Sequence, residues 1–123
     1  MVMTIEEAQE KMAVTPENIR SVKGVFMNWH NYSLLLNNEK YENRKIIPVG
    51  GVYFSATQID MALKSVPRKK REVFYKHYVD GISQSELARS RKPSKVSQAL
   101  VQWEISEALA RVLEFLAEIA SGT

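Results

Sequence analysis

The chain has 123 residues, enough for one compact domain, and its 45% hydrophobic and 25% charged composition is that of an ordinary globular protein. No apolar run approaches the roughly 18 residues needed to span a membrane, and the first residues include acids where a secretory signal carries bases. Without cysteine, neither disulfides nor thiolate metal sites are available. We therefore expect a cytoplasmic protein, in a bacterial host cell and on its nucleoid when bound to DNA.

The net charge of +3 is distributed unevenly along the chain. Residues 64–95 contain ten bases and three acids, a net charge of +7, whereas the rest of the chain carries −4. A basic block suits a polyanion-binding face, because neutralised phosphates release their condensed counterions. The alternative is a solvated surface on which bases cluster by chance.

Residues 1–54 are predicted to form an N-terminal helical region followed by a loop or hairpin. Thr4 and Glu7 have the spacing of a capping box, and Thr15 precedes a proline at what would be the first helical position of a second helix. That helix has one apolar face and is expected to run into the thirties, with Ile19, Val22, Phe26 and Trp29 at helical spacing.

The segment from Ile46 to Phe54 is predicted to form a short β-hairpin. Two β-prone runs flank Gly50 and Gly51, and glycine supplies the positive φ that tight turns require. Pro48 lacks an N–H group, which confines the first strand to a sheet edge. A loop without regular structure is the alternative.

Residues 55–123 are predicted to form a helical domain with short breaks. Its helices start at capping boxes or at a proline, namely Ser55 with Gln58, Pro67, and Ser83 with Glu86. The last helix is expected to begin at Ser94 and to reach about Ala120, since this stretch lacks glycine and proline. The expected fold class is therefore mainly α, with a long last helix.

The stretch from Ser83 to Leu100 has the pattern of a helix-turn-helix. Ala88 is small enough to let a second helix approach, and the break at residues 91–93 would form the tight turn. The residues expected to face inward are Leu87, Val96 and Leu100. Because Lys reaches guanine acceptors and Gln pairs with adenine in the major groove, the start of the second helix is the candidate base reader.

The candidate DNA-binding residues fall into two groups. Those expected to reach base edges are Ser94, Lys95, Ser97 and Gln98. Those expected to contact phosphates are Ser83, Gln84, Lys69, Arg91 and Lys92. A register shift of about one turn would give the base-reading role to Ser97 or Gln102 instead.

Several motifs resemble the region-4 helix-turn-helix of sigma-70-type factors. They are Ala62-Leu63-Lys64-Ser65-Val66-Pro67, Arg71-Glu72-Val73-Phe74, Tyr78-Val79-Asp80-Gly81-Ile82-Ser83 and Glu86-Leu87-Ala88, within a span from about Ala62 to Leu109. The resemblance implies binding of promoter DNA and contact with RNA polymerase. At the turn the chain departs from the family pattern, since Arg91-Lys92-Pro93 replaces the usual glycine-containing turn.

The layout of the whole chain is similar to that of RinA/ArpU-type phage late transcriptional regulators. Both have a helical N-terminal part, a Gly-Gly segment followed by a Ser or Thr helix start (here Gly50-Gly51 and Ser55), and a C-terminal region-4-like module. This resemblance implies a phage-type regulator that binds specific duplex DNA.

The tryptophans, the histidines and the acids of the last helix are interpreted as structural or surface residues, not as parts of a functional site. We expect Trp29 and Trp103 in the core, and His30 and His77 lack metal-ligand spacing. The acids of the last helix are expected on a solvated face, namely Glu104, Glu107, Glu114 and Glu118. With no phosphate-binding loop and no nucleophile elbow, the sequence predicts no catalytic, cofactor or metal site, and hence no enzyme.

The last helix carries more apolar surface than one helix-turn-helix covers. Either the N-terminal helices or a second protomer would pack on this surplus, and we expect a homodimer, which would suit paired half-sites. Two other functions stay open: a small-terminase-like DNA-packaging subunit, and a helix-turn-helix used only for protein interaction.

Overall fold

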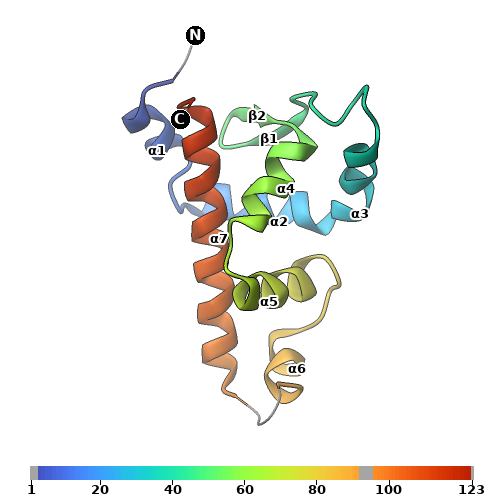
Figure 1. Ribbon diagram of the computed structural model, residues 1–123. Coiled ribbons are helices and arrows are strands. Elements are labelled where there is room, and N and C mark those ends of the chain that lie inside the picture. Colours follow the sequence, from blue (N-terminus) through green and yellow to red (C-terminus); the bar gives the residue numbers. More distant parts are fainter. Residues whose placement is uncertain (1–2, 92–95, 123) are drawn as a thin grey trace.

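The computed structural model describes residues 3–91 and 96–122. Its elements in chain order are α1 (Ile5–Lys11), α2 (Pro16–Met27), α3 (Trp29–Tyr32), the 3-10 helix η1 (Ser33–Asn37), β1 (Ile47–Val49), β2 (Val52–Phe54), α4 (Ala56–Lys64), α5 (Arg68–Tyr78), α6 (Gln84–Arg89) and α7 (Gln98–Ala120). Helix α7 runs the length of the molecule, with α1 and the hairpin near its C-terminal end and α6 near its start (Figure 1). The predicted mainly α fold with a long last helix is confirmed.

The first two helices begin where their caps predict. Thr4 accepts a hydrogen bond from the backbone N–H of Glu7, and Thr15 caps α2 ahead of its N-terminal proline. The second helix does not continue unbroken into the thirties, however. Asn28 ends α2, and its side-chain amide donates to the carbonyl of Gly24 at 2.9 Å. An asparagine side chain competes with the helical backbone in this way, and the chain resumes as the short α3 and η1.

The predicted hairpin is confirmed. β1 and β2 pair antiparallel with Val49 opposite Val52, and the two residues between them, Gly50 and Gly51, have φ values of 60° and 78°. Positive φ at both central positions is the signature of the type I′ turn, whose twist matches that of the strands. Ile47, Val49 and Phe54 turn into the core, so the hairpin covers one side of the helices.

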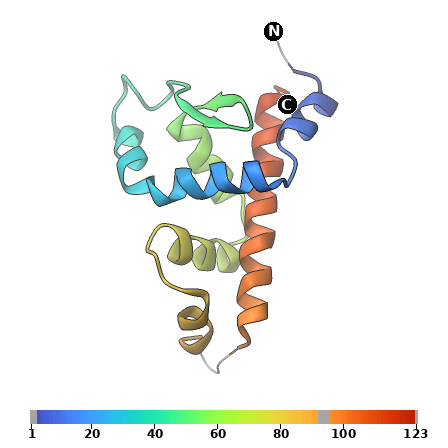
Figure 2. The same ribbon diagram turned by 180° about the vertical axis from the view of Figure 1, so that it is seen from behind.

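One hydrophobic core contains residues of both predicted segments, 1–54 and 55–123. Helix α2 packs against β1 and α5, on the side of the molecule that faces the viewer in Figure 2. Between α2 and α5, the ring of Phe26 meets that of Phe74 edge-on with centroids 5.1 Å apart, and Phe74 in turn meets Tyr78. Burial among these groups raises the pKa of the Tyr78 hydroxyl.

The surplus apolar surface of the last helix is covered within the chain. Helix α1 packs on α7, and Leu113 and Leu116 are buried where the N-terminal elements approach it. The apolar surplus therefore gives no argument for a homodimer. Within residues 3–91 and 96–122, no helix combines the length and the apolarity of a membrane span.

The turn glycine Gly50 makes the closest approach between the hairpin and the N-terminal helices. A Cβ atom on Gly50 would lie 2.5 Å from the carbonyl oxygen of Lys11 and 2.6 Å from Cε of Met12, whereas one on Gly51 would meet nothing within 4 Å. Both positions carry the same kind of backbone strain for an L-residue, about 1–2 kcal/mol.

We therefore expect Gly50→Ala to lower the free energy of unfolding by more than Gly51→Ala, which serves as the matched control. The control should show only the backbone strain, and Gly50→Ala should add the cost of moving backbone away from the new methyl group. Urea denaturation followed by circular dichroism measures both. Equal losses would show that the contact between Gly50 and α1 does not hold the hairpin in place.

Candidate nucleic-acid interface

Helices α5, α6 and the first turns of α7 form a three-helix unit at one end of the molecule (Figure 1). Helix α6 packs against both α7 and α5, and its buried residues are Leu87 and Ala88. Ala88 also contacts the chain just before α7, since its carbonyl accepts a hydrogen bond from the N–H of Val96 at 3.2 Å. A short helix therefore packs against the start of the long last helix, in the order that the sequence predicted.

The connection between these two helices is not the predicted tight turn. It spans residues 90–97, whereas a standard helix-turn-helix joins its helices by about three to four residues. The predicted start of the last helix at Ser94 was also wrong. Ser97 is the N-cap, its hydroxyl accepting from the N–H of Leu100 at 3.1 Å, so α7 begins three residues later than expected. The candidate residues Lys92, Ser94 and Lys95 lie outside the described residues.

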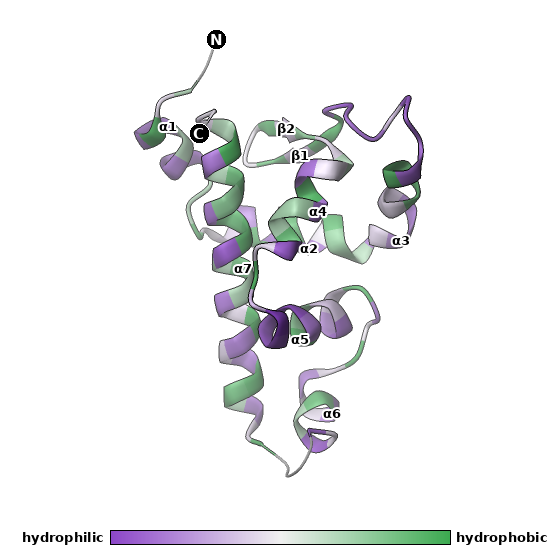
Figure 3. Ribbon diagram, viewed as in Figure 1, coloured by the Kyte–Doolittle hydropathy of each residue, from purple (hydrophilic) through white to green (hydrophobic). Residues whose placement is uncertain are grey.

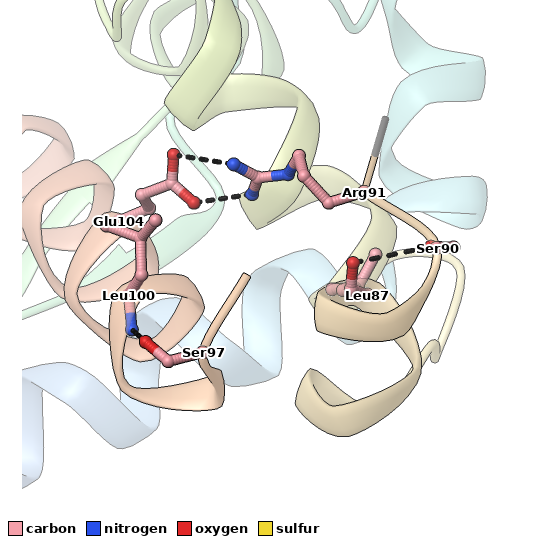
Figure 4. A network of polar contacts seen from close by, with 6 residues as sticks. All are labelled: Leu87, Ser90, Arg91, Ser97, Leu100 and Glu104. Carbon is pink, nitrogen blue, oxygen red and sulfur yellow. Dashed lines mark hydrogen bonds and ion pairs between the residues drawn. The ribbon is translucent and has the colours of Figure 1, made fainter. Parts of the chain in front are cut away.

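A buried ion pair ties this connection to α7. The two terminal guanidinium nitrogens of Arg91, Nη1 and Nη2, donate to the carboxylate of Glu104, with Nη1 3.4 Å from Oε2 (Figure 4). Only 16% of the Arg91 side chain and 6% of the Glu104 side chain are exposed. Two interpretations therefore need correction: Glu104 is not on a solvated face, and Arg91 is engaged by a carboxylate instead of being displayed to a phosphate.

The pair also determines the charge of the exposed start of α7. Glu104 is the only charged residue between Ser97 and Ser106, and it points inward, neutralised by Arg91. The first exposed acid of the helix is Glu107. The first two turns therefore present an uncharged face to solvent.

Because α7 begins three residues later than predicted, its exposed face contains residues other than those expected. The exposed residues are Ser97, Gln98, Ala99, Leu100, Gln102 and Trp103. Leu100, predicted to face inward, is 39% exposed, and Val101 takes the inward position. Trp103, predicted to be core like the buried Trp29, is 51% exposed. The sequence prediction counted helical positions from Ser94, whereas the helix is capped three residues later at Ser97. The prediction therefore assigned part of the exposed face incorrectly.

The start of α5 places basic side chains beside this face. The Nζ of Lys70 lies 4.6 Å from the centroid of the Trp103 ring, a cation–π contact that joins the two helices. Figure 3 shows the strongly hydrophilic start of α5 next to α7. Lys69 is exposed, and no ion pair involves it or Lys70 among the described residues.

Other predicted phosphate ligands have local partners. The hydroxyl of Ser83 accepts from the N–H of Glu86 at 3.2 Å as the cap of α6, and Gln84 is half-buried at the first position of that helix. The neighbouring base Arg68 pairs with Glu72 at 3.1 Å on the exposed side of α5. Of the candidates, the structure leaves Lys69, Ser83, Ser97 and Gln98 exposed. It adds the exposed Leu100 and Trp103, and the half-buried Lys70 of the basic block.

Among residues 3–91 and 96–122, no group of three or more His, Cys, Asp or Glu side chains is placed to hold a metal ion. No family model matches the chain, and neither the curated proteins nor the solved structures gave a match. The geometry of the α5–α7 unit is therefore the basis on which we infer a function.

Replacing Arg91 with Ala should strongly destabilise the fold, because it leaves the Glu104 charge buried and unpaired, at a typical cost of about 3–5 kcal/mol. The matched control is Arg68→Ala, which breaks the exposed pair with Glu72 and should cost no more than about 1 kcal/mol. Thermal and urea denaturation measure both changes.

A second variant distinguishes the cost of an unpaired buried charge from the cost of lost side-chain packing. The double replacement Arg91→Met with Glu104→Leu removes both charges and should recover most of the stability lost in Arg91→Ala, since apolar groups of similar volume commonly replace a buried pair well. A small loss for Arg91→Ala, similar to that of Arg68→Ala, would mean that the pair does not hold the connection on α7.

Proposed function

We propose that this protein binds specific duplex DNA and thereby regulates transcription. In this proposal the exposed start of α7 enters the major groove, and the basic start of α5 contacts the phosphate backbone. The observation that carries the proposal is the uncharged exposed face of α7, free of acids as far as Glu107, with Lys69 and Lys70 beside it. A polyanion would meet attraction there without like-charge repulsion.

The dimensions and chemistry of this unit support the proposal. The major groove is about 12 Å wide and admits one α-helix, and the start of α7 projects beyond the rest of the core, at the end where α6 lies (Figure 1). The amides of Gln98 and Gln102 are suited to base edges. The sequence resemblance to sigma-70 region 4 favours transcription over other DNA transactions, and contact with RNA polymerase belongs to the same proposal.

A second candidate function is a protein-interaction module. It is favoured by the exposure of Leu100 and Trp103, since exposed aromatic residues commonly anchor protein interfaces. The two functions differ in salt dependence. DNA binding releases counterions, whereas an interface built on Trp103 would respond weakly to salt.

Binding to duplex DNA should weaken steeply with salt, with a log–log slope of several units, because each neutralised phosphate contributes about 0.9. Lys69→Ala should weaken binding to preferred and random duplexes alike and lower the slope by about one. Lys11→Ala is the matched control, since Lys11 is exposed on α1 at the far end of the molecule. Fluorescence anisotropy titrations at several salt concentrations give these slopes; a flat response would contradict the proposal.

Gln98→Ala should reduce the preference of the protein for its selected DNA sequence. We expect it to cost about 1–3 kcal/mol on the preferred site and to relax the preference at one base pair. Gln9→Ala, at an exposed glutamine of α1, is the matched control and should change nothing. The preferred site comes from selection out of random duplexes, followed by titration of both variants on preferred and scrambled DNA. Equal losses on both duplexes would show that Gln98 does not read bases.

A further inference from the structure

We infer that the exposed face at the start of α7 reads A·T base pairs, with glutamine amides on adenine and aliphatic side chains against the thymine methyl group. This inference rests on the proposed function, and it names the base pairs that the face would select. It follows from which side chains the observed register turns outward.

The first two turns of α7 lack the side chains that usually read G·C pairs. Guanine is most often read by Arg or Lys and cytosine by Asp or Glu. Between Ser97 and Ser106 the only charged residue is Glu104, and its carboxylate is buried against Arg91. The outward side chains between Ser97 and Ser106 are therefore amides, hydroxyls and apolar groups.

These side chains form two stripes, one on each flank of the exposed face. Gln98 and Gln102 are four residues apart and share one side of the helix. Leu100 and Trp103, three residues apart, form an apolar stripe on the opposite flank of the exposed face, and Ala99 lies between the two stripes. All five are exposed.

An A·T pair offers a matching pattern in the major groove. Adenine presents N7 and N6, which pair bidentately with a glutamine amide, and thymine presents O4 and the 5-methyl group. With the centre of the exposed face in the groove, the amide stripe on one flank would meet the adenine of one A·T pair, and the apolar stripe on the other flank would meet the thymine methyl group of a neighbouring pair. Leu100, 39% exposed, has the aliphatic surface that would cover the methyl group.

The lysines at the start of α5 would set how α7 is oriented on the DNA. Lys70 lies over the ring of Trp103, so the apolar stripe meets the basic start of α5 at this point. Lys69, in the same turn of α5, is exposed. With these cations on the phosphates, the side of α7 that carries Ala99 and Leu100 faces the adjoining base edges, which supports duplex DNA as the occupant of this face.

The test replaces thymine by deoxyuridine in the selected duplex, which removes only the methyl groups. The full chain should bind the uracil duplex about fourfold more weakly for each methyl group contacted, the fold-change that corresponds to burial of one methyl-sized group. Leu100→Ala should bind both duplexes with more nearly equal affinity. Met61→Ala, at an exposed apolar residue of α4, is the control and should keep the full thymine preference.

The possible outcomes separate this inference from the proposed function. Salt-dependent binding with equal affinity for thymine and uracil duplexes would overturn the inference and leave DNA binding intact, as would a selected site made only of G·C pairs. Absence of binding to any duplex would overturn both. A thymine preference that survives Leu100→Ala, with circular dichroism unchanged, would also overturn the assignment of this face.

Discussion

The 23 residues of α7 form one rigid rod, about 35 Å long at 1.5 Å per residue, that is shared by both ends of the molecule. Its C-terminal end is buried against α1, and the rest of its length packs against α4, α5 and α6. A straight helix bends sharply only at identifiable defects such as proline, and α7 has none. The direction in which its exposed start points is therefore set by the whole core.

The Arg91–Glu104 pair adds a local constraint to this global one. The connection between the end of α6 at Arg89 and the start of α7 at Gln98 is longer than a standard helix-turn-helix turn. Two contacts hold its described ends: the ion pair from Arg91 to α7, and the hydrogen bond from Val96 to Ala88 of α6. The same pair keeps a carboxylate away from the surface that we propose for DNA. One interaction thus serves both the packing and the charge of the candidate interface.

The parts of the fold that depend on near neighbours in the sequence could be predicted. The caps at Thr4, Thr15, Ser55 and Ser83 and the glycine turn of the hairpin each involve residues within a few positions, and all were predicted correctly. The interruption of the second helix at Asn28 was missed, since its cause is a single side chain that bonds the backbone.

The details of the candidate site could not be predicted in the same way. Both Ser94 and Ser97 are acceptable caps by residue type, and only contacts made elsewhere, by Arg91 and Val96, decide where α7 begins. Glu104 looks like a surface acid until its partner, thirteen residues earlier, is known. The inward prediction for Leu100 followed from the assumed start at Ser94, so that single error also misplaced the exposed face.

The central claim is that the start of α7, beside the basic start of α5, is the surface that meets duplex DNA. The chain has two tryptophans, the buried Trp29 and the exposed Trp103, so 5-fluorotryptophan labelling gives one fluorine NMR signal at the surface and one in the core. Trp103→Phe assigns them. The account predicts that titration with the selected duplex shifts the Trp103 signal, that added salt reverses the shift, and that the Trp29 signal stays in place. A Trp103 signal that does not move while the duplex is bound would contradict it.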